Sequence, residues 1–356
     1  MMSDDAGRPR AGAKWAVLLV TCVVAVLIAE GMLRLFWTNP YGSNSVRMMV
    51  ELQTQTKGVS RQIDRTVINK KNPIISFRTD GRGYIEPVRR FDRPDATVAF
   101  FGGSTTECMF VAEPMRFPAR ASVLLEQRRM KINALNAGVS GNDVHQSINN
   151  LFNYVVADKP DVAVLMEAAN DIGHLRGAGS YQLQMGQAPT LGTLGRLIFT
   201  RFSAHSSILA LVRHTRTLRD NKRAIDRASG PAAPLGAKRP LPVEQYKQRL
   251  RAFVGICRAF SIKPVLMTQP SNAVRNELTP GWYDPEAQIV FNQAIRDVAA
   301  EEKVDLIDLV AFLAARPASP EPLFYDGIHV TDYGSDLYAQ HIAARLQEIV
   351  PPRPTG

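Results

Sequence analysis

The chain has 356 residues with only three cysteines, and its 43 Lys and Arg residues against 33 Asp and Glu give a net charge of +10. This length is enough for one sizeable α/β domain with additions, and three cysteines are too few for a disulfide framework. The basic residues are spread along the chain without a nucleic-acid-binding motif, so we expect no nucleic-acid partner. An anionic membrane surface or an acidic glycan is the more natural partner for this charge.

The N-terminal segment predicts a membrane anchor. Residues 15–29 carry no charge, and the apolar character continues as far as Trp37. A helix needs about 20 predominantly apolar residues to cross a bilayer, so residues 15–37 are long enough, with Trp15 and Trp37 at the two interfaces. We therefore expect residues 15–37 to form one transmembrane helix in contact with membrane lipid.

The charges beside this segment predict its orientation. Arg8, Arg10 and Lys14 precede the apolar stretch, whereas the next basic residue beyond it is Arg47. By the positive-inside rule, residues 1–14 stay in the cytoplasm and the rest of the chain lies outside it. We expect a single-pass protein of the inner (cytoplasmic) membrane with a periplasmic or otherwise extracytoplasmic domain. The alternative is a cleaved signal peptide, but no small-residue cleavage site follows the stretch.

Residues 38–96 predict a juxtamembrane connector. Pro40, Pro73 and Pro94 interrupt regular patterns in this range, and the one helical pattern is a short stretch at residues 46–52. Proline removes a backbone donor and restricts the residue before it, so it breaks both helices and central strands. We expect this range to link the anchor to the domain that follows.

From Thr97 the chain alternates between strand-like and helix-like patterns. Short apolar and β-branched runs predict strands at residues 98–101, 132–135, 162–166, 264–268 and 305–309. Amphipathic stretches predict helices at residues 118–127, 144–156, 243–260, 285–301 and 332–349. The alternation predicts one α/β domain over residues 97–350, with a central parallel sheet of about five strands covered by helices on both faces.

A long insertion, at about residues 177–242, separates the third and fourth of these strands. Its first part is glycine-rich, and a basic, partly amphipathic stretch then runs over residues 194–227. One interpretation is a helical excursion that packs on the domain. The other is a lid over the functional site, or a surface helix that faces lipid headgroups. Residues 351–356 form a short tail.

Ser104 stands where a buried strand must turn sharply. It follows the apolar run 97–101 and the pair Gly102-Gly103. A serine just beyond the carboxyl end of a strand and ahead of a helix is exposed over the sheet, where a nucleophile can reach a substrate. A serine nucleophile needs a base, and that base needs an orienting group. The plainer interpretation of the segment is an ordinary turn.

Asp326 and His329 supply both of those groups on one short loop, in the run Tyr-Asp-Gly-Ile-His at residues 325–329. The carboxylate can fix the imidazole tautomer through one ring nitrogen, while the other ring nitrogen faces the serine. Taken alone, the pair also fits a surface turn ahead of the last helix.

Two further segments at predicted strand ends carry hydrogen-bond donors. Gly141 lies in the stretch Asn-Ala-Gly-Val-Ser-Gly that follows the second strand, and Asn170 lies in Glu-Ala-Ala-Asn-Asp after the third. A glycine N–H and an asparagine amide are suitable donors for an oxyanion beside the serine. The blander interpretation of Asn170 and Asp171 is a helix cap or an Asx-turn.

In their order and spacing, these four segments resemble the SGNH (GDSL-type) hydrolase family over residues 97–350. The resemblance implies Ser104 as nucleophile, His329 as base and Asp326 as orienting group, with Gly141, Asn170 and the Ser104 N–H as the oxyanion hole. It also implies a three-layer αβα, flavodoxin-like fold. The chain departs from the family pattern twice, with Gly103 in place of Asp and Ala168 in place of Gly. Gly-Gly-Ser also occurs in relatives that act on acylated sugars.

The resemblance implies a membrane-anchored serine esterase that removes an acyl group, with acetyl as the expected group, from a carbohydrate or envelope glycoconjugate. The first alternative is an O-acetyltransferase that acts on an exopolysaccharide with the same triad. The second is a non-catalytic glycan-binding or assembly component. No cofactor is expected.

The remaining cysteines and histidines predict no metal site. His145, His174, His205, His214 and His341 are scattered without metal-ligand spacing. Cys108 and Cys257 predict buried free thiols; the alternative is a bridge between them in an oxidising compartment.

Overall fold

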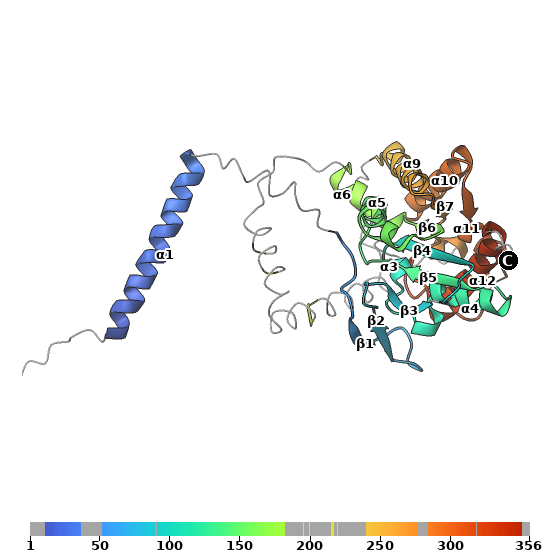
Figure 1. Ribbon diagram of the computed structural model, residues 1–356, viewed down its shortest axis with the longest axis horizontal. Coiled ribbons are helices and arrows are strands. Elements are labelled where there is room, and N and C mark those ends of the chain that lie inside the picture. Colours follow the sequence, from blue (N-terminus) through green and yellow to red (C-terminus); the bar gives the residue numbers. More distant parts are fainter. Residues whose placement is uncertain are drawn as a thin grey trace, which may run out of the picture. The chain divides into compact units, whose positions relative to one another are not determined.

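The structure is a computed structural model of the chain (Figure 1). It describes residues 11–36, 52–89, 91–181, 240–275, 284–317 and 319–350, together with isolated positions between 195 and 219. The chain divides into two units, Met1–Glu51 and Leu52–Gly356. Each unit is described by itself below.

Helix α1 (Ala11–Phe36) is the element that the structure describes in the first unit. Apolar side chains along it are exposed, among them Trp15 at 71% and Leu19 at 67%. None of the helices within the described ranges is long and apolar enough to cross a membrane. The transmembrane helix predicted over residues 15–37 is therefore not found.

The second unit is built on a six-stranded sheet with the strand order β3-β5-β4-β6-β7-β8. Five of these strands are parallel to one another: β4 (Ala96–Gly102), β5 (Ile132–Asn136), β6 (Val162–Met166), β7 (Lys263–Met267) and β8 (Asp305–Ile307). Strand β3 (Ile85–Arg89) is antiparallel to β5 at the edge. The sheet is thus mixed and mostly parallel, a correction to the all-parallel sheet that we predicted. The first parallel strand, β4, lies between β5 and β6, so the strand order reverses there and opens a crevice at the carboxyl ends.

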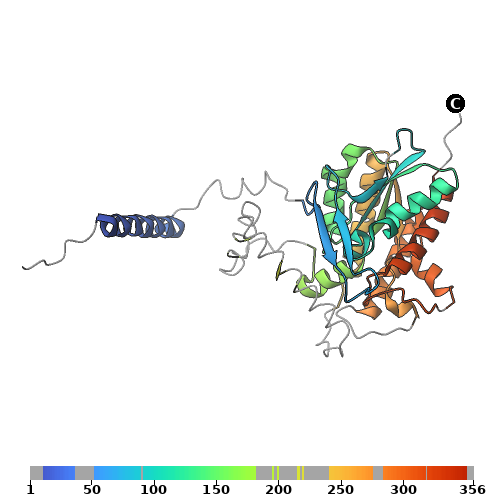
Figure 2. The same cartoon turned by 90° about the horizontal axis from the view of Figure 1, so that it is seen from below.

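Helices cover both faces of this sheet (Figure 2). Along β4, Val98 and Phe100 belong to one hydrophobic cluster, whereas Ala99 and Phe101 belong to another. This alternation follows from the two-residue period of a strand, and its uniformly apolar run is typical of a strand buried on both faces. The first cluster includes side chains of α4 (Phe117–Gln127), α11 (Leu309–Ala314) and α12 (Asp332–Ile349). The second includes side chains of α5 (Val144–Asn153), α6 (Ala169–Ala178), α9 (Val243–Ala259) and α10 (Pro285–Glu301).

The described part of the range 38–96, which was expected to be a connector, includes strands β1 (Ser60–Asp64), β2 (Ile74–Arg78) and β3. Strands β1 and β2 form an antiparallel pair. Ile63, Ile75 and Phe77 on this pair pack with Ile85 of β3 into a third hydrophobic cluster. The short helix predicted at residues 46–52 falls almost entirely outside the described residues.

The other predicted elements agree closely with the structure. Helices α10 and α12 have the predicted bounds, and the five parallel strands lie where the apolar runs indicated. The predicted strand 305–309 ends at Ile307, because the Asp308 side chain accepts from the Ala311 N–H and starts α11. The structure adds short helices that we did not predict: α3 (Ser104–Glu107), η1 (Glu113–Met115), η2 (Val155–Asp158) and η3 (Asn272–Arg275), as well as α6 and α11.

Most of the insertion at 177–242 lies outside the described residues, including all but isolated positions of the stretch 194–227 proposed as a lid or surface helix. The tail at 351–356 lies outside them as well.

Candidate active site

Ser104 lies at the carboxyl end of β4, at the first position of helix α3. It is partly exposed, whereas Gly102, Gly103 and Thr105 around it are buried. The Gly103 carbonyl accepts from the N–H groups of Thr106 and Glu107, so the chain turns into the helix directly after the strand. This turn presents the serine hydroxyl above the carboxyl end of the sheet, as the sequence predicted.

Gly103 is required by the close approach of a neighbouring side chain. A Cβ at this position would lie 2.3 Å from Asn170 Nδ2 and 3.0 Å from the Asn142 carbonyl oxygen. Any other residue here would force the Asn170 amide to move. Asn170 thus lies directly against the turn that carries Ser104.

His329 and Asp326 lie on the loop between α11 and α12, and the chain folds back on itself there. The Tyr325 N–H donates to the His329 carbonyl oxygen (3.0 Å), and Phe324 and Val330 form a β-bridge. Asp326 Oδ1 accepts from the N–H groups of Ile328 (2.9 Å) and His329 (2.8 Å). The loop is thus folded around the Asp326 carboxylate, which is 8% exposed.

The structure brings together the three residues predicted to form a triad. Ser104 Oγ lies 2.7 Å from His329 Nε2, and His329 Nδ1 lies 2.7 Å from Asp326 Oδ2. Burial by itself would raise the pKa of Asp326. The charge and hydrogen bonds of His329, with the Ile328 N–H, instead hold that pKa below its ordinary value. Asp326 is thus an anion that can orient the imidazole, and the imidazole contacts the serine hydroxyl.

The two predicted oxyanion donors flank the same turn. Asn170, in the first turn of α6, donates from Nδ2 to the Asn142 carbonyl oxygen at 2.6 Å. An amide nitrogen carries two hydrogens, so one of them is left for a substrate. Gly141 lies in the adjacent turn with φ of +84°, a left-handed conformation that favours glycine. Both residues are positioned by the segment at 139–142, where the Asn142 N–H closes a turn on Val139.

Several residues that hold this turn were missed in the sequence. Glu107, the last residue of α3, is buried; its side chain accepts from the Ser140 hydroxyl and from Gln55 Nε2, the latter at 2.8 Å. Gln53 Nε2 donates to the Ser140 carbonyl oxygen at 3.1 Å. Burial raises the pKa of Glu107. In the sequence, only Glu107 could have been suspected of a role at the site, because it lies three residues after Ser104. Gln53 and Gln55 gave no such signal, because they lie in the range expected to be a connector.

Gln269 connects the nucleophile helix to the Asn170 segment. Its Oε1 accepts from the Ala169 N–H at 2.7 Å, and its Nε2 donates to Thr105 Oγ1 at 2.8 Å. The residue lies just after β7 and is 3% exposed. Its role was not predicted, although its place just beyond a strand end is a sequence signal for a site residue. Gln269 fixes the relative positions of the residues next to Ser104 and Asn170.

Two buried carboxyl groups lie behind Asn170. Burial and the neighbouring Asp171 raise the pKa of Glu167 well above its ordinary value. Burial and the nearby Asp143 carboxylate raise the pKa of Asp171 to about 8. Ser147 donates to Glu167 Oε1 (2.9 Å), and the Val144 N–H (3.1 Å) and Tyr181 hydroxyl (2.5 Å) donate to Asp171 Oδ1. Through these hydrogen bonds the two buried groups join α5 to the Asn170 segment.

The cysteines and histidines outside the triad carry no catalytic signal. Cys108 and Cys257 are free and buried, as predicted, and burial raises the pKa of each thiol to about 12. Within the described ranges, no group of three or more His, Cys, Asp or Glu side chains could hold a metal ion. His341 stacks on Phe312 with ring centroids 4.2 Å apart, while His205 and His214 lie outside the described residues.

Comparison with known proteins places this site in a family. Among the solved structures that are similar at low identity are the following two. A lipase/acylhydrolase from Enterococcus faecalis is 15% identical over 73% of this chain and 100% of that chain, with a TM-score of 0.45. An acetylxylan esterase from Geobacillus stearothermophilus is 16% identical over 71% of this chain and 94% of that chain, with a TM-score of 0.43. None of the curated proteins compared with the chain matches it. The model of the GDSL-like lipase/acylhydrolase family matches residues 100–337. The chain therefore belongs to this family, and it is a hydrolase that acts on ester bonds.

Proposed function

We propose that this hydrolase is a serine esterase in which Ser104, His329 and Asp326 form the catalytic triad. The observation that carries the proposal is the continuous contact from the Ser104 hydroxyl to His329 and on to Asp326, with both distances at 2.7 Å. Both distances are within the range required for proton transfer between a nucleophile, its base and an orienting group.

In the first half of the reaction, Ser104 Oγ attacks the ester carbonyl carbon while His329 Nε2 accepts its proton. The negative charge on the tetrahedral intermediate is stabilised by the N–H groups of Gly141 and Ser104 and by the Asn170 amide. His329 then protonates the departing alcohol, which leaves an acyl group on Ser104. In the second half, water attacks this acyl-enzyme with His329 again as base, and the acid and free serine are released.

Asp326 stabilises the imidazolium that forms in both halves. Its depressed pKa keeps it ionised at neutral pH, and the N–H groups of Ile328 and His329 hold the carboxylate in place. Proton transfer to His329 then places opposite charges in contact within a largely buried site. This charge stabilisation requires no movement of the loop.

The proposed substrate is an acylated carbohydrate or glycoconjugate, with acetyl as the group removed. Gly-Gly-Ser at the nucleophile, shared with relatives that act on acylated sugars, supports this choice. Acetyl is the simplest acyl group that such an ester presents to Ser104.

The assay that tests this function uses the purified full-length chain with 4-nitrophenyl acetate, with and without an oligosaccharide acceptor. We expect acetate release in both cases, and Ser104→Ala should lower the rate by more than about a thousandfold, the usual cost of losing a triad member. Residual turnover above that level would exclude Ser104 as the nucleophile. Transfer of acetyl to the oligosaccharide in place of acetate release would identify an acetyltransferase.

We also propose that the hydrolase domain acts outside the cytoplasm, held at the inner membrane by the N-terminal segment. The sequence supports this through Arg8, Arg10 and Lys14 ahead of the uncharged residues 15–29. The exposed apolar side chains of α1, such as Val17 and Leu27, also suit contact with lipid.

Protease added to intact spheroplasts tests this location. We expect the hydrolase domain to be degraded and the N-terminal peptide to be recovered from the membrane fraction by mass spectrometry. A domain that is protected until the cells are lysed would contradict the topology. A mature N-terminus beyond residue 37 would show instead that the segment is a cleaved signal.

A further inference from the structure

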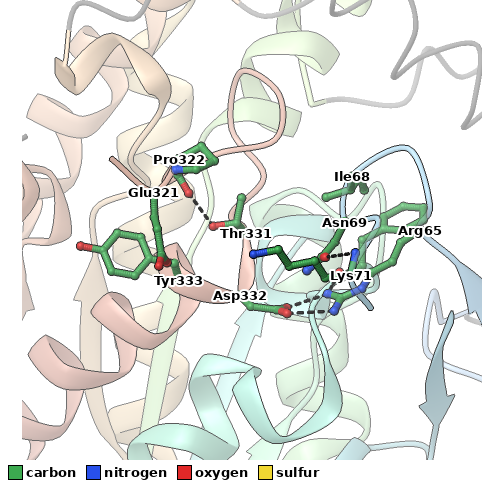
Figure 3. Close-up of a pocket in the computed structure, with 10 residues that line it drawn as sticks. Arg65, Ile68, Asn69, Lys71, Glu321, Pro322, Thr331, Asp332 and Tyr333 are labelled. Carbon is green, nitrogen blue, oxygen red and sulfur yellow. Dashed lines mark hydrogen bonds and ion pairs between the residues drawn. The ribbon is translucent and has the colours of Figure 1, made fainter. Parts of the chain in front are cut away.

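A cavity of about 360 Å³ lies beside the loop that carries His329 (Figure 3). Its volume is at the small end of the range for ligand pockets, about 300 to 1,000 Å³. Ile68, Asn69 and Lys71 come from the loop between β1 and β2, Phe110 from the segment after α3, and Glu321 and Tyr333 from either side of the His329 loop. The walls therefore come from three separate parts of the chain.

A buried ion pair fixes these parts to one another. Arg65, whose side chain is 1% exposed, donates from both terminal nitrogens to the Asp332 carboxylate, at 2.7 and 2.8 Å. The same guanidinium donates to the carbonyl oxygens of Asn72 and Phe110, each at 2.9 Å. Because all three walls are tied through one side chain, the cavity is formed before any ligand enters it.

The cavity adjoins the catalytic base through a series of aromatic rings. Phe110 contacts the Tyr325 ring edge to face, with centroids 6.0 Å apart, and Tyr325 stacks on His329 at 5.6 Å. Two further lining residues, Thr331 and Asp332, lie two and three positions after His329 in the chain. A substrate whose ester lies at Ser104 and whose remainder extends past His329 would reach this cavity.

The lining chemistry suits an uncharged sugar. The Arg65 and Asp332 charges cancel, and the remaining charges, Lys71 and Glu321, are opposite in sign and lie on facing loops. Figure 3 shows the Lys71 side chain extending from the β1–β2 loop toward Thr331. An ammonium donor and a carboxylate acceptor match sugar hydroxyls, which both donate and accept, while a net anion would meet as much repulsion as attraction. The rings of Phe110 and Tyr333 add apolar surface.

We propose that this cavity binds a neutral sugar unit of the acylated carbohydrate whose ester is cleaved at Ser104. The inference rests on the proposed esterase function and specifies which part of the enzyme recognises the substrate. Loss of the cavity contacts should weaken action on a saccharide ester without affecting an ester that has no sugar.

The test compares Lys71→Ala with Lys70→Ala in the full-length chain. Both residues are exposed and both variants remove one positive charge from the same loop, but only Lys71 lines the cavity. With partially acetylated cello-oligosaccharides, Lys71→Ala and Glu321→Gln should each lower kcat/KM by about 5- to 10-fold, the effect of one lost hydrogen bond. All three variants should hydrolyse 4-nitrophenyl acetate within about twofold of the wild-type rate.

A binding measurement separates the cavity from the chemistry. Ser104→Ala protein is titrated calorimetrically with the same oligosaccharides, alone and combined with Lys71→Ala or Lys70→Ala. Only the Lys71 change should weaken binding. Equal behaviour of the two lysine variants, or stronger binding of acetylated oligouronates than of the neutral probe, would overturn the proposal. If wild-type protein hydrolyses neither ester, the esterase function fails, and the titration still decides whether the cavity binds sugar.

Discussion

The two sides of Ser104 are held in place by different kinds of interaction. The oxyanion side, residues 138–142 together with Asn170, is packed against carboxyl groups with raised pKa values, those of Glu107, Glu167 and Asp171. The base side, residues 325–332, is held by ionised groups. Asp326 has a lowered pKa, and Asp332 makes a two-pronged ion pair with Arg65.

This difference reflects what each side must do. The base side carries a positive imidazolium during the reaction, so a permanent negative charge at Asp326 stabilises it. The oxyanion side receives a negative charge, and ionised carboxylates behind Asn170 would oppose it. The raised pKa values favour the protonated, uncharged forms of Glu167 and Asp171, whose oxygens accept from Ser147, Tyr181 and the Val144 N–H. The two sides should therefore respond differently to the loss of a charge and to pH.

Breaking the ion pair of the base side should give the largest effect on stability. Arg65→Ala leaves Asp332 with the Ala112 N–H but without its ion-pair partner, and it removes the bonds to Asn72 and Phe110. Removal of one partner of a buried pair costs about 3–5 kcal/mol, which we expect as a loss in the free energy of unfolding measured with urea. The kcat for 4-nitrophenyl acetate should fall as well, because the loop that carries His329 is less well fixed.

Arg78→Ala is the matched control for this prediction. Arg78 also lies on the β1–β2 pair and also makes a two-pronged bond, to Glu113, but its side chain is 51% exposed. Exposed pairs contribute about 0–1 kcal/mol. Equal losses in the two variants would show that burial of the Arg65 pair does not hold the base side.

On the oxyanion side, Asn170→Ala should lower kcat by about 10²- to 10³-fold with little change in KM, the signature of one lost oxyanion donor. Steady-state kinetics with 4-nitrophenyl acetate measures this. The control is Asn153→Ala, since Asn153 also donates its amide to a backbone carbonyl but is exposed on α5. A raised KM with unchanged kcat would make Asn170 a substrate-binding or structural residue instead.

A smaller effect should appear in the slope of the unfolding free energy plotted against pH. Asp171 has a folded-state pKa of about 8 against an unfolded value of about 3.9. Between these values the unfolded chain releases a proton that the folded chain keeps, so stability falls as pH rises, by at most about 1.4 kcal/mol per pH unit. Asp171→Asn should remove this contribution and flatten the dependence of the unfolding free energy between about pH 5 and 7.

The control for the pH dependence is Asp297→Asn. Lys247 holds the pKa of Asp297 below its ordinary value, so this carboxylate is ionised in both states over the same window. Its replacement should shift the curve slightly without changing its slope. Parallel curves for wild type and Asp171→Asn would show that Asp171 does not retain its proton in the folded protein.

Much of this architecture follows from short-range patterns in the sequence. The uniformly apolar runs of β4 and β6 predicted strands buried on both faces. Helices α10 and α12 begin where their amphipathic stretches predicted, and the structure adds that the side chains of Asp284 and Thr331 cap them. Ser104, Asp326 and His329 were recognisable because strand ends and a four-residue loop place them by local geometry alone.

Contacts between distant parts of the chain were decided by the tertiary structure. Arg65 and Asp332 are 267 positions apart, and nothing in either segment indicates the other. Likewise, the amide of Gln269 and the carboxyl of Glu107 acquire their roles only when the sheet brings separate strand ends together. Burial, which sets the pKa values on the oxyanion side, is a property of the packed domain and not of any segment. The sequence by itself determined which residues are candidates for the chemistry, whereas the packed structure determined how firmly, and in which charge state, their supports hold them.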